Sequence, residues 1–544
     1  MKKRMSVIFL SFLLVVSLMQ CYAAAEKQTR LEENAREVNY DGSSPHVLIP
    51  EQYSSYLGGS SNDELTALVF EEPDIVYLAG TTSSTDFADP NGYQDTNAGA
   101  ADCFIMKMNI ATETVIYATY IGGNASDYLA DIAVDDDGNL YATGFTVSLD
   151  FPTVNAYQPV FGMHTNPTSD FPTVHTCQWN IRHTTAAFVF KLNPTGDELL
   201  YSMSFGPTST NVAGASIDVD SSGNSYVFGD VFGGGIDLVN PIDDVRGIEE
   251  CILLKFNSTG NGLDYASYIG GSDADYPSSM SIDDDGNVFL IGYTESDDLP
   301  GLSGYDTSYN GAKDCFVIKL NSTLNGYEYS TYIGGAGIDE TSSATVDSSG
   351  SVFVTGSTSS TAFPTVNAYD DEISGLRDCF VFSLMPDGSS LSYSTYLGGS
   401  GVDYGEGIVT YLNEAVFVTG HTRSSDFPTT NGADTSFNGE TDCFVSKLNL
   451  STNALEYSTY VGGSLDDYGE CIAVTSDESM IIAGYTTSED FPTDTSHKGM
   501  NDWFLHEILK PVLSGGFDPT LLLYVGVGVA AVVVIAVVVY VKRR

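Results

Sequence analysis

An acidic residue recurs at one fixed place in a repeated pattern of this sequence, and carboxylates in such a pattern can bind a metal ion. Ten residues after a recurring tyrosine stand Asp63, Asp127, Asp275, Asp339, Asp403 and Asp467, with Asn211 at this place in a further copy. Converging carboxylates are the ligands that Ca²⁺ prefers, so one hypothesis is a calcium-binding ring of these side chains at the mouth of a central channel. The alternative is that each Asp accepts hydrogen bonds from the backbone of its own turn, which requires no ligand.

A second set of candidate residues lies between positions 164 and 183. The set comprises His164, His175, Cys177, Trp179, Arg182 and His183. Aromatic and arginine side chains on a loop suit contact with a partner. Two of the histidines and the cysteine could also bind zinc, but their spacing matches no strong zinc motif. A plain surface insertion is the third interpretation, and the residue types favour it over a metal site.

The sequence contains none of the common catalytic motifs. It has no Gly-x-Ser-x-Gly, no His-Glu-x-x-His and no phosphate loop. The acidic runs at 135–139 and 283–287 lack the length and the closing Glu of an EF-hand, so we interpret them as hairpin turns. We therefore predict no catalytic residues, and calcium is the one cofactor that remains open.

An internal repeat must position these residues. A Tyr-x-x-Tyr-x-Gly-Gly block begins at Tyr53, Tyr117, Tyr265, Tyr329, Tyr393 and Tyr457, with a degenerate copy at Tyr201. The interval is 64 residues, except for one interval of 84 that contains a duplicated Asp-Phe-Pro-Thr-Val segment. A glycine column and a cysteine column keep the same phase, so seven copies of one structural unit are present.

Each copy is predicted to form four short strands. In the copy that starts at residue 329 we expect strands at 341–347, 352–356, 378–384 and 391–396, where β-branched and aromatic residues dominate. Gly, Asp, Asn and Ser fill the turns between them. Four strands without helical periodicity are typical of a propeller blade, whereas the coils of a β-solenoid are shorter.

The two ends of the repeat predict a closed ring. The block at 53–56 has no strands before it, and the last copy stops after its third strand at 503–509. The first block can supply the missing fourth strand, which leaves no unpaired edge. The predicted fold is therefore all-β, a seven-bladed β-propeller of four-stranded blades closed by the N-terminal strand.

The repeat resembles the SBBP family of β-propeller repeat proteins. Tyr393-Ser-Thr-Tyr-Leu-Gly-Gly399, Val352-Phe-Val-Thr-Gly356, Asp426-Phe-Pro-Thr429 and Asp442-Cys-Phe-Val-Ser-Lys-Leu448 carry the resemblance. It covers residues 51–510 and implies the fold and an exported setting, but no particular activity.

The cysteines and sequons follow the same repeat. Cys103, Cys251, Cys315, Cys379 and Cys443 occupy one equivalent place in five copies. Equivalent places in neighbouring blades lie too far apart for a disulfide, so we expect buried free thiols. Candidate glycosylation sites are Asn124, Asn257, Asn321 and Asn449. All but the first fall at equivalent turns after the third strand.

The chain ends predict export and anchoring. Residues 1–25 read as a signal peptide, with lipidation at Cys21 as a weaker alternative. Residues 26–50 and 511–519 read as linkers, and 520–541 as a transmembrane helix, because 521–541 contains no charge. The basic residues 542–544 then form a cytoplasmic tail, which places the propeller outside a cell membrane as a single-pass protein.

The charge of the chain excludes one class of partner. The net charge is −51, so nucleic acid is an unsuitable partner. We expect a cell-surface binding, adhesion or recognition module with a protein or glycan ligand, anchored to the membrane by its C-terminal helix. The alternatives are a polysaccharide-active enzyme with its site at the channel mouth and a structural component of a surface layer.

Overall fold

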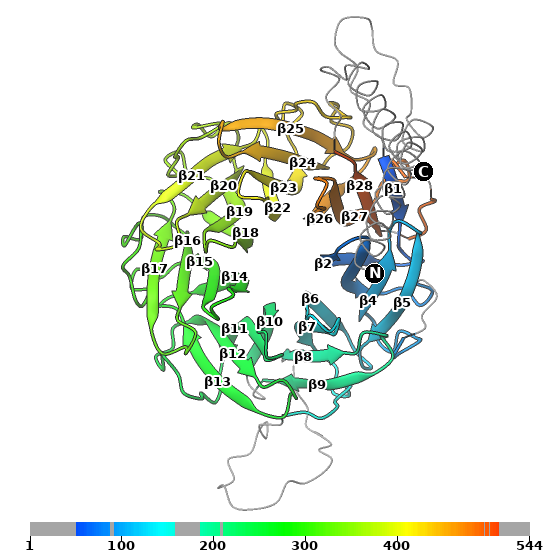
Figure 1. Cartoon of the computed structure of the whole chain (residues 1–544), viewed down its shortest axis with the longest axis vertical. Helices are drawn as coiled ribbons and strands as arrows, with labels where there is room; N and C mark the ends of the chain where they lie inside the picture. Colours follow the sequence, from blue (N-terminus) through cyan, green and yellow to red (C-terminus); the bar gives the residue numbers. More distant parts are fainter. Residues whose placement is uncertain are drawn as a thin grey trace, which may run out of the picture. The chain divides into compact units, whose positions relative to one another are not determined.

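The computed structural model describes residues 51–510, apart from 88–91, 158–184, 207–209, 494 and 500. These residues form seven antiparallel sheets of four strands each, arranged in a ring around a central opening (Figure 1). The all-β seven-bladed propeller predicted from the repeat is therefore confirmed.

Strands that occupy the same place in each blade have similar lengths. The innermost strands are β2 (Asp63–Glu71), β6 (Asp127–Val134), β10 (Thr210–Val219), β14 (Asp275–Ile282), β18 (Asp339–Val346), β22 (Asp403–Tyr411) and β26 (Asp467–Val474). The second strands are β3 (Ile75–Thr82), β7 (Leu140–Thr146), β11 (Ser225–Gly233), β15 (Val288–Thr294), β19 (Val352–Thr358), β23 (Ala415–Thr422) and β27 (Met480–Thr486).

The outer half of each blade completes the sheet. The third strands are β4 (Asp102–Asn109), β8 (Ala186–Leu192), β12 (Glu249–Phe256), β16 (Asp314–Leu320), β20 (Asp378–Leu384), β24 (Asp442–Asn449) and β28 (Asp502–Ile508). The outermost strands are β5 (Thr114–Ile121), β9 (Leu199–Phe205), β13 (Leu263–Ile269), β17 (Tyr327–Ile333), β21 (Leu391–Leu397), β25 (Ala454–Val461) and β1 (Glu51–Tyr56).

The N-terminal strand closes the ring, as predicted. The last sheet has the strand order β1-β28-β27-β26. The backbone N–H of Leu57 donates to the carbonyl oxygen of Trp503 at 2.8 Å. The hydroxyl of Tyr56 donates to the carbonyl oxygen of Ser488 at 2.6 Å. Chain segments more than 430 residues apart therefore share one sheet.

The glycine column reflects a close approach of two backbones. A side chain at Gly144 would place its Cβ 2.1 Å from the carbonyl oxygen of Tyr128 on the neighbouring strand. The ladder between β6 and β7 skips a residue at this point, between Leu129 and Asp131. The same irregularity recurs in every blade, so the innermost strand bends where only glycine fits opposite it.

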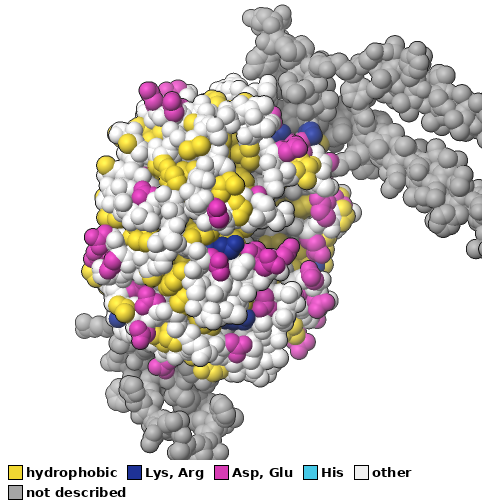
Figure 2. Space-filling model, turned by 60° about the vertical axis from the view of Figure 1, so that its left-hand side comes forward, with side chains coloured by type: hydrophobic (Ala, Val, Ile, Leu, Met, Phe, Trp, Pro, Cys, Tyr) yellow, Lys and Arg dark blue, Asp and Glu magenta, His cyan; other side chains and the backbone are white. Residues whose placement is uncertain are grey.

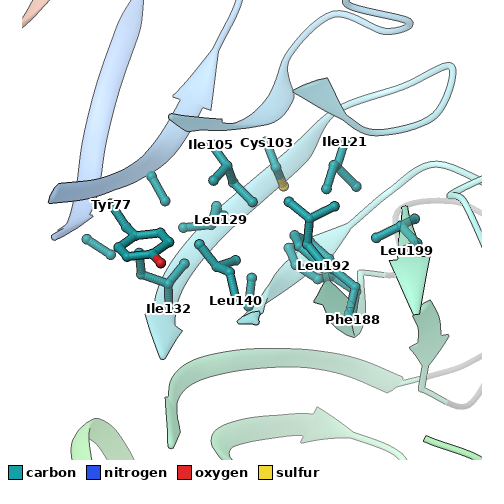
Figure 3. Packing of buried hydrophobic residues seen from close by; sticks show 14 of the residues in the cluster. Tyr77, Cys103, Ile105, Ile121, Leu129, Ile132, Leu140, Phe188, Leu192 and Leu199 are labelled. Atoms are coloured by element: carbon teal, nitrogen blue, oxygen red, sulfur yellow. The ribbon is translucent and has the colours of Figure 1, made fainter. Parts of the chain in front are cut away.

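Apolar side chains fill the space between adjacent blades. Figure 3 shows one such layer, in which Ile105 and Cys103 of β4 pack with Leu129 of β6 and Leu140 of β7. Both faces of each sheet are covered by neighbouring sheets, which explains why strands such as β20 are buried along their whole length.

The five column cysteines are free and fully buried, as predicted. Burial raises the pKa of each thiol well above its ordinary value. Because the thiolate is the reactive form, we expect these five residues to resist alkylation in the folded protein and to react after unfolding without reductant. Mass spectrometry of each peptide checks this. Modification of Cys103 under native conditions would show that its blade junction opens.

Some predicted segments lie outside the described residues. These are the signal peptide, the linker at 26–50, the segment 511–519, the transmembrane helix at 520–541 and the tail. Among the described residues, no helix is long and apolar enough to span a membrane.

Candidate ligand-binding site at the mouth of the ring

The aspartate column is built into the turns of the blades. Asp127 is completely buried. It accepts hydrogen bonds from the backbone N–H of Gly123 at 2.7 Å, from Ser148 Oγ at 2.8 Å and from Thr146 Oγ1. The same Gly, Ser and Thr donors serve the other five aspartates of the column. Hydrogen bonding within each turn therefore accounts for the repetition of this residue.

A second buried carboxylate faces each of these aspartates from the preceding blade. These second carboxylates form a column of their own, and each stands at the start of a third strand: Asp102, Glu250, Asp314, Asp378, Asp442 and Asp502. A Cβ built on Gly122 would lie 2.6 Å from Asp102 Oδ1 and 2.8 Å from Asp127 Oδ2, so the two carboxyl groups flank this glycine. Asp102 Oδ1 has no hydrogen-bond partner. Six blade junctions therefore contain a buried pair of carboxyl groups.

The junction between the second and third blades differs from the other six. The repeat spacing places Asn211 in the aspartate column, but the sheet register puts Val212 there, because Val212 pairs with Val231 where Asp63 pairs with Thr82. The assignment of Asn211 from the sequence was therefore wrong by one residue. Ala186 replaces the second carboxylate, and Gly206 contacts Val212 and Ala186 in place of two carboxyl groups.

The remaining residues predicted from the sequence are the metal, loop and glycosylation candidates. Among the described residues, no group of three His, Cys, Asp or Glu side chains is arranged to hold a metal ion. The loop candidates His164, His175, Trp179, Arg182 and His183 lie outside the described residues. Asn257, Asn321 and Asn449 lie at equivalent turns, as predicted, and their side chains hydrogen-bond within those turns. Asn124 is exposed in another loop.

Stacked pairs of aromatic side chains lie at the start of the innermost strands in four of the seven blades. Each pair joins a side chain of an innermost strand to its neighbour on the second strand. The pairs are Tyr128–Phe145, Tyr276–Tyr293, Tyr404–His421 and Tyr468–Tyr485, with ring centroids 4.7–4.8 Å apart. We call these eight residues the aromatic belt. All are partly exposed, Tyr128 to 38%.

Two cations lie over aromatic rings of the belt. Lys313 Nζ is 4.8 Å from the ring centroids of both Tyr276 and Tyr293. The Arg377 guanidinium is 5.5 Å from the ring centroid of Tyr404. Both cations form 2.9 Å ion pairs with Glu340. Burial would raise the pKa of Glu340, but the Lys313 hydrogen bond and the Arg377 charge outweigh it and lower the pKa.

Three acidic side chains lie near the belt residues of the sixth and seventh blades. Glu406 and Glu470 lie on the innermost strands of the sixth and seventh blades, and exposed Glu64 lies on that of the first. Burial raises the pKa of Glu470, and the charges of Glu406 and Glu64 add to this shift. Burial likewise raises the pKa of Glu406. His421 Nδ1 lies 3.6 Å from Glu406 Oε1, and burial lowers the pKa of His421 to about 4.

The arrangement is suited to binding a polar ring or an organic cation. Flat aromatic faces provide apolar contact area, and the carboxylates provide acceptors and negative charge beside them. Figure 2 shows a hollow in the surface with hydrophobic side chains in its wall and acidic side chains beside it.

Reasoning from the sequence missed the aromatic belt, although a signal was present. In the second, fourth, sixth and seventh blades a Tyr follows the column Asp, and an aromatic residue or His follows the column Gly. The first, third and fifth blades have neither. The two positions change together because they are cross-strand neighbours.

Comparisons with known proteins concern the fold. A protein of unknown function from Dyadobacter fermentans shows 8% identity and a TM-score of 0.39, covering 85% of this chain and 99% of that one. BamB from Moraxella catarrhalis shows 10% identity and a TM-score of 0.36, covering 85% and 100%. Quinohemoprotein alcohol dehydrogenase from Comamonas testosteroni shows 8% identity and a TM-score of 0.39, covering 85% and 76%. These similarities transfer no function.

The sequence itself identifies the repeat. No curated protein sequence matches the chain. The family model for the SBBP β-propeller repeat matches residues 116–152, 264–300 and 328–364. Each match runs from the outermost strand of one blade to just beyond the second strand of the next, in the phase of the 64-residue repeat. The chain is therefore a seven-bladed β-propeller in which three segments match the SBBP β-propeller repeat.

Proposed function

We propose that this protein is a cell-surface recognition module that binds a glycan at the aromatic belt. The observation that carries the proposal is the set of four stacked pairs at the start of the innermost strands. Sugar rings present C–H groups on their faces and hydroxyl groups on their edges. The aromatic faces suit the C–H groups, while Glu64, Glu340, Glu406 and Glu470 accept hydrogen bonds from hydroxyl groups.

The setting outside the cell is part of the same proposal. It rests on the signal peptide and the apolar C-terminal segment predicted from the sequence, together with the large negative charge. A rigid ring anchored at one end would display its loops and its opening to ligands outside the membrane. Protease shaving of intact cells, followed by detection of propeller peptides, tests this placement.

The belt itself is tested by substitution. We expect the Tyr404→Ala/Tyr468→Ala double variant to bind glycans at least about tenfold more weakly on a glycan array, because each stacked ring contributes about 1 kcal/mol. Tyr369→Ala is the control, because this tyrosine is also accessible to solvent, with 39% of its surface exposed, but lies outside the belt. Equal loss in the two variants, or full binding by the double variant, would contradict the proposal.

Polysaccharide cleavage is a second candidate function, and the Glu406–Glu470 pair favours it. Glycosidases use two carboxyl groups, one of which stays protonated near neutral pH to act as the acid. Burial raises the pKa of both glutamates. Incubation with the glycans that bind on the array, followed by an assay for new reducing ends, distinguishes cleavage from binding alone.

A further inference from the structure

Glu406 and Glu470 depart from the repeat in a way that the fold does not require. They occupy the skipped position of the innermost strand, one residue before Gly407 and Cys471 resume the ladder. The same position in the other five blades holds small uncharged residues, namely Thr66, Ala130, Ala215, Ser278 and Ser342. Two adjacent blades therefore place carboxyl groups where the fold needs none.

No cation of the described residues compensates these two carboxyl groups. The structure shows no ion pair from lysine or arginine to either of them; Lys313 and Arg377 are paired with Glu340 instead. Arg423 Nε donates to Thr441 Oγ1 at 3.2 Å. His421 is the one basic side chain beside Glu406, and its lowered pKa leaves it neutral above about pH 4. Glu64 adds a further negative charge on the other side of Glu470.

The aromatic faces beside these carboxyl groups complete a site for a cation. Tyr485 stacks on Tyr468, and the ring of His421 meets Tyr468 edge to face at 4.9 Å between centroids. Elsewhere in the belt, Lys313 and Arg377 lie over tyrosine rings, which shows the geometry that a cation adopts here. Among the described residues, no lysine or arginine lies over the Tyr468–Tyr485 pair.

We propose that Glu406, Glu470 and the Tyr468–Tyr485 pair bind the ammonium group of an amino sugar. This inference rests on the proposed function, because it specifies which glycan the belt selects. The ammonium group lies between the two carboxylates and against the face of a tyrosine ring, and the pyranose ring stacks on the neighbouring aromatic side chains. A neutral N-acetylated sugar stacks equally well but cannot pair with the carboxylates.

Proton release distinguishes this arrangement from simple stacking. The two carboxyl groups hold protons near neutral pH in the free protein, because burial and their mutual repulsion disfavour the charged forms. An ammonium ion favours the ionised forms, so its binding must displace protons. The groups that face the pair include Glu64, His421 and Tyr485. Burial lowers the pKa of His421 to about 4 and raises the pKa of Tyr485 above its ordinary value, so neither of these two groups releases a proton near pH 6.

The experiment is isothermal titration calorimetry of the full-length protein with two ligands. The first is the hexasaccharide of glucosamine and the second is that of N-acetylglucosamine. Both are titrated at pH 6 in two buffers of different ionisation enthalpy, which yields the number of protons released. The variants are Glu406→Gln/Glu470→Gln and, as a control for lost negative charge, Glu328→Gln on the exposed part of β17.

We expect the amino sugar to bind at least about tenfold more tightly than its acetylated counterpart and to release protons, because hydrogen bonds to charged groups are among the stronger ones. The double Gln variant should lose this preference and the proton release, whereas Glu328→Gln should keep both. The Gln substitutions remove two carboxyl groups whose burial is unfavourable, so we expect the double variant to remain folded. Unfolding should therefore not explain its loss of ligand preference. Thermal melts verify this.

Three other results would overturn the inference. Equal affinity for both hexasaccharides, unaffected by the double variant, would leave glycan recognition intact but remove the ammonium site. Absence of binding to these sugars and to every glycan on the array would remove the proposed function and the inference with it. Release of shorter sugars would assign the carboxyl pair to cleavage and contradict the ammonium site.

Discussion

Deletion of residues 51–57 is expected to destabilise the whole propeller, although this segment contributes one strand of the twenty-eight that the described residues form. Without β1, the third strand of the last blade exposes its edge and the ring has no closure. The deletion also removes buried Tyr56, whose ring packs 6.2 Å from that of Phe491. Loss of a buried aromatic residue alone costs about 3–5 kcal/mol.

The deleted hydrogen bonds add to this loss. Ser54 Oγ donates to the carbonyl oxygen of Pro492 at 2.7 Å, and the Tyr56 backbone N–H donates to Thr495 Oγ1 at 2.7 Å. Each such bond is worth about 1 kcal/mol. We expect a melting temperature lower by about 5 °C or more and the appearance of oligomers, because each kcal/mol shifts the melting temperature of a fold of this size by about 1 °C.

The closing role of β1 can be separated from simple loss of a tyrosine. Tyr396 makes the same hydroxyl-to-carbonyl contact, to Ser360 at 2.6 Å, within a blade made of one continuous segment. Tyr56→Ala and Tyr396→Ala should be destabilised to a similar degree, but only the first should form oligomers by strand exchange in size-exclusion chromatography. An unchanged melting temperature after the 51–57 deletion would show that closure does not stabilise the ring.

The stability of the propeller should fall as the pH rises from about 5 to about 8. Burial raises the pKa to about 6 in Asp63, Asp102, Asp275, Asp314 and Asp378, to about 7 in Asp467 and to about 8 in Glu250. In the unfolded chain these groups ionise near pH 4. Between the two pKa values the folded state binds more protons, so a rise in pH favours unfolding.

The magnitude follows from the number of groups. Each group that is protonated in the folded state and ionised in the unfolded state contributes a slope of about 1.4 kcal/mol per pH unit. With several such groups, the expected loss of unfolding free energy between pH 5 and pH 8 is on the order of several kcal/mol. Urea denaturation at fixed ionic strength measures it. A free energy that stays constant or increases over this range would contradict the protonation of these buried carboxyl groups in the folded state.

A variant tests whether the carboxyl pairs cause this pH dependence. Asp378→Asn removes a titrating group while keeping its shape, and its neighbour Asp403 keeps the donors Gly399, Thr422 and Ser424. The slope of stability against pH should decrease in this variant. Asp284→Asn, in the exposed turn between β14 and β15, serves as the control and should leave the slope unchanged.

The sequence predicted the architecture because the repeat supplied seven independent readings of one pattern. In the copy that starts at residue 329, the predicted strand at 378–384 coincides with β20, and the ends of the other three predicted strands agree with the structure within two residues. The closure was predictable because the two incomplete ends add up to one blade. The place of Val212 in the aspartate column was not predictable. In the degenerate third copy the sheet register shifts by one residue relative to the repeat spacing, and spacing alone cannot detect such a shift.

The candidate site was predictable only in part. The aspartate column was evident, and the turn interpretation describes its hydrogen bonds. Its partner column was overlooked because Asp102 and Asp127 belong to neighbouring copies, and comparison of equivalent positions does not show which different positions meet. The aromatic belt needed the cross-strand register of Tyr404 and His421, which only the folded sheet provides.

The apolar junction between the second and third blades offers a template for protein engineering. There the replacement is complete: Ala186, Val212, Val231 and Gly233 stand where the other junctions have Asp or Glu, Asp, Thr and Ser. None of these four polar side chains remains at this junction, and a single survivor would be a buried group without its partners. Grafting these four residues as a block onto another junction, rather than one at a time, should yield a ring that withstands alkaline conditions.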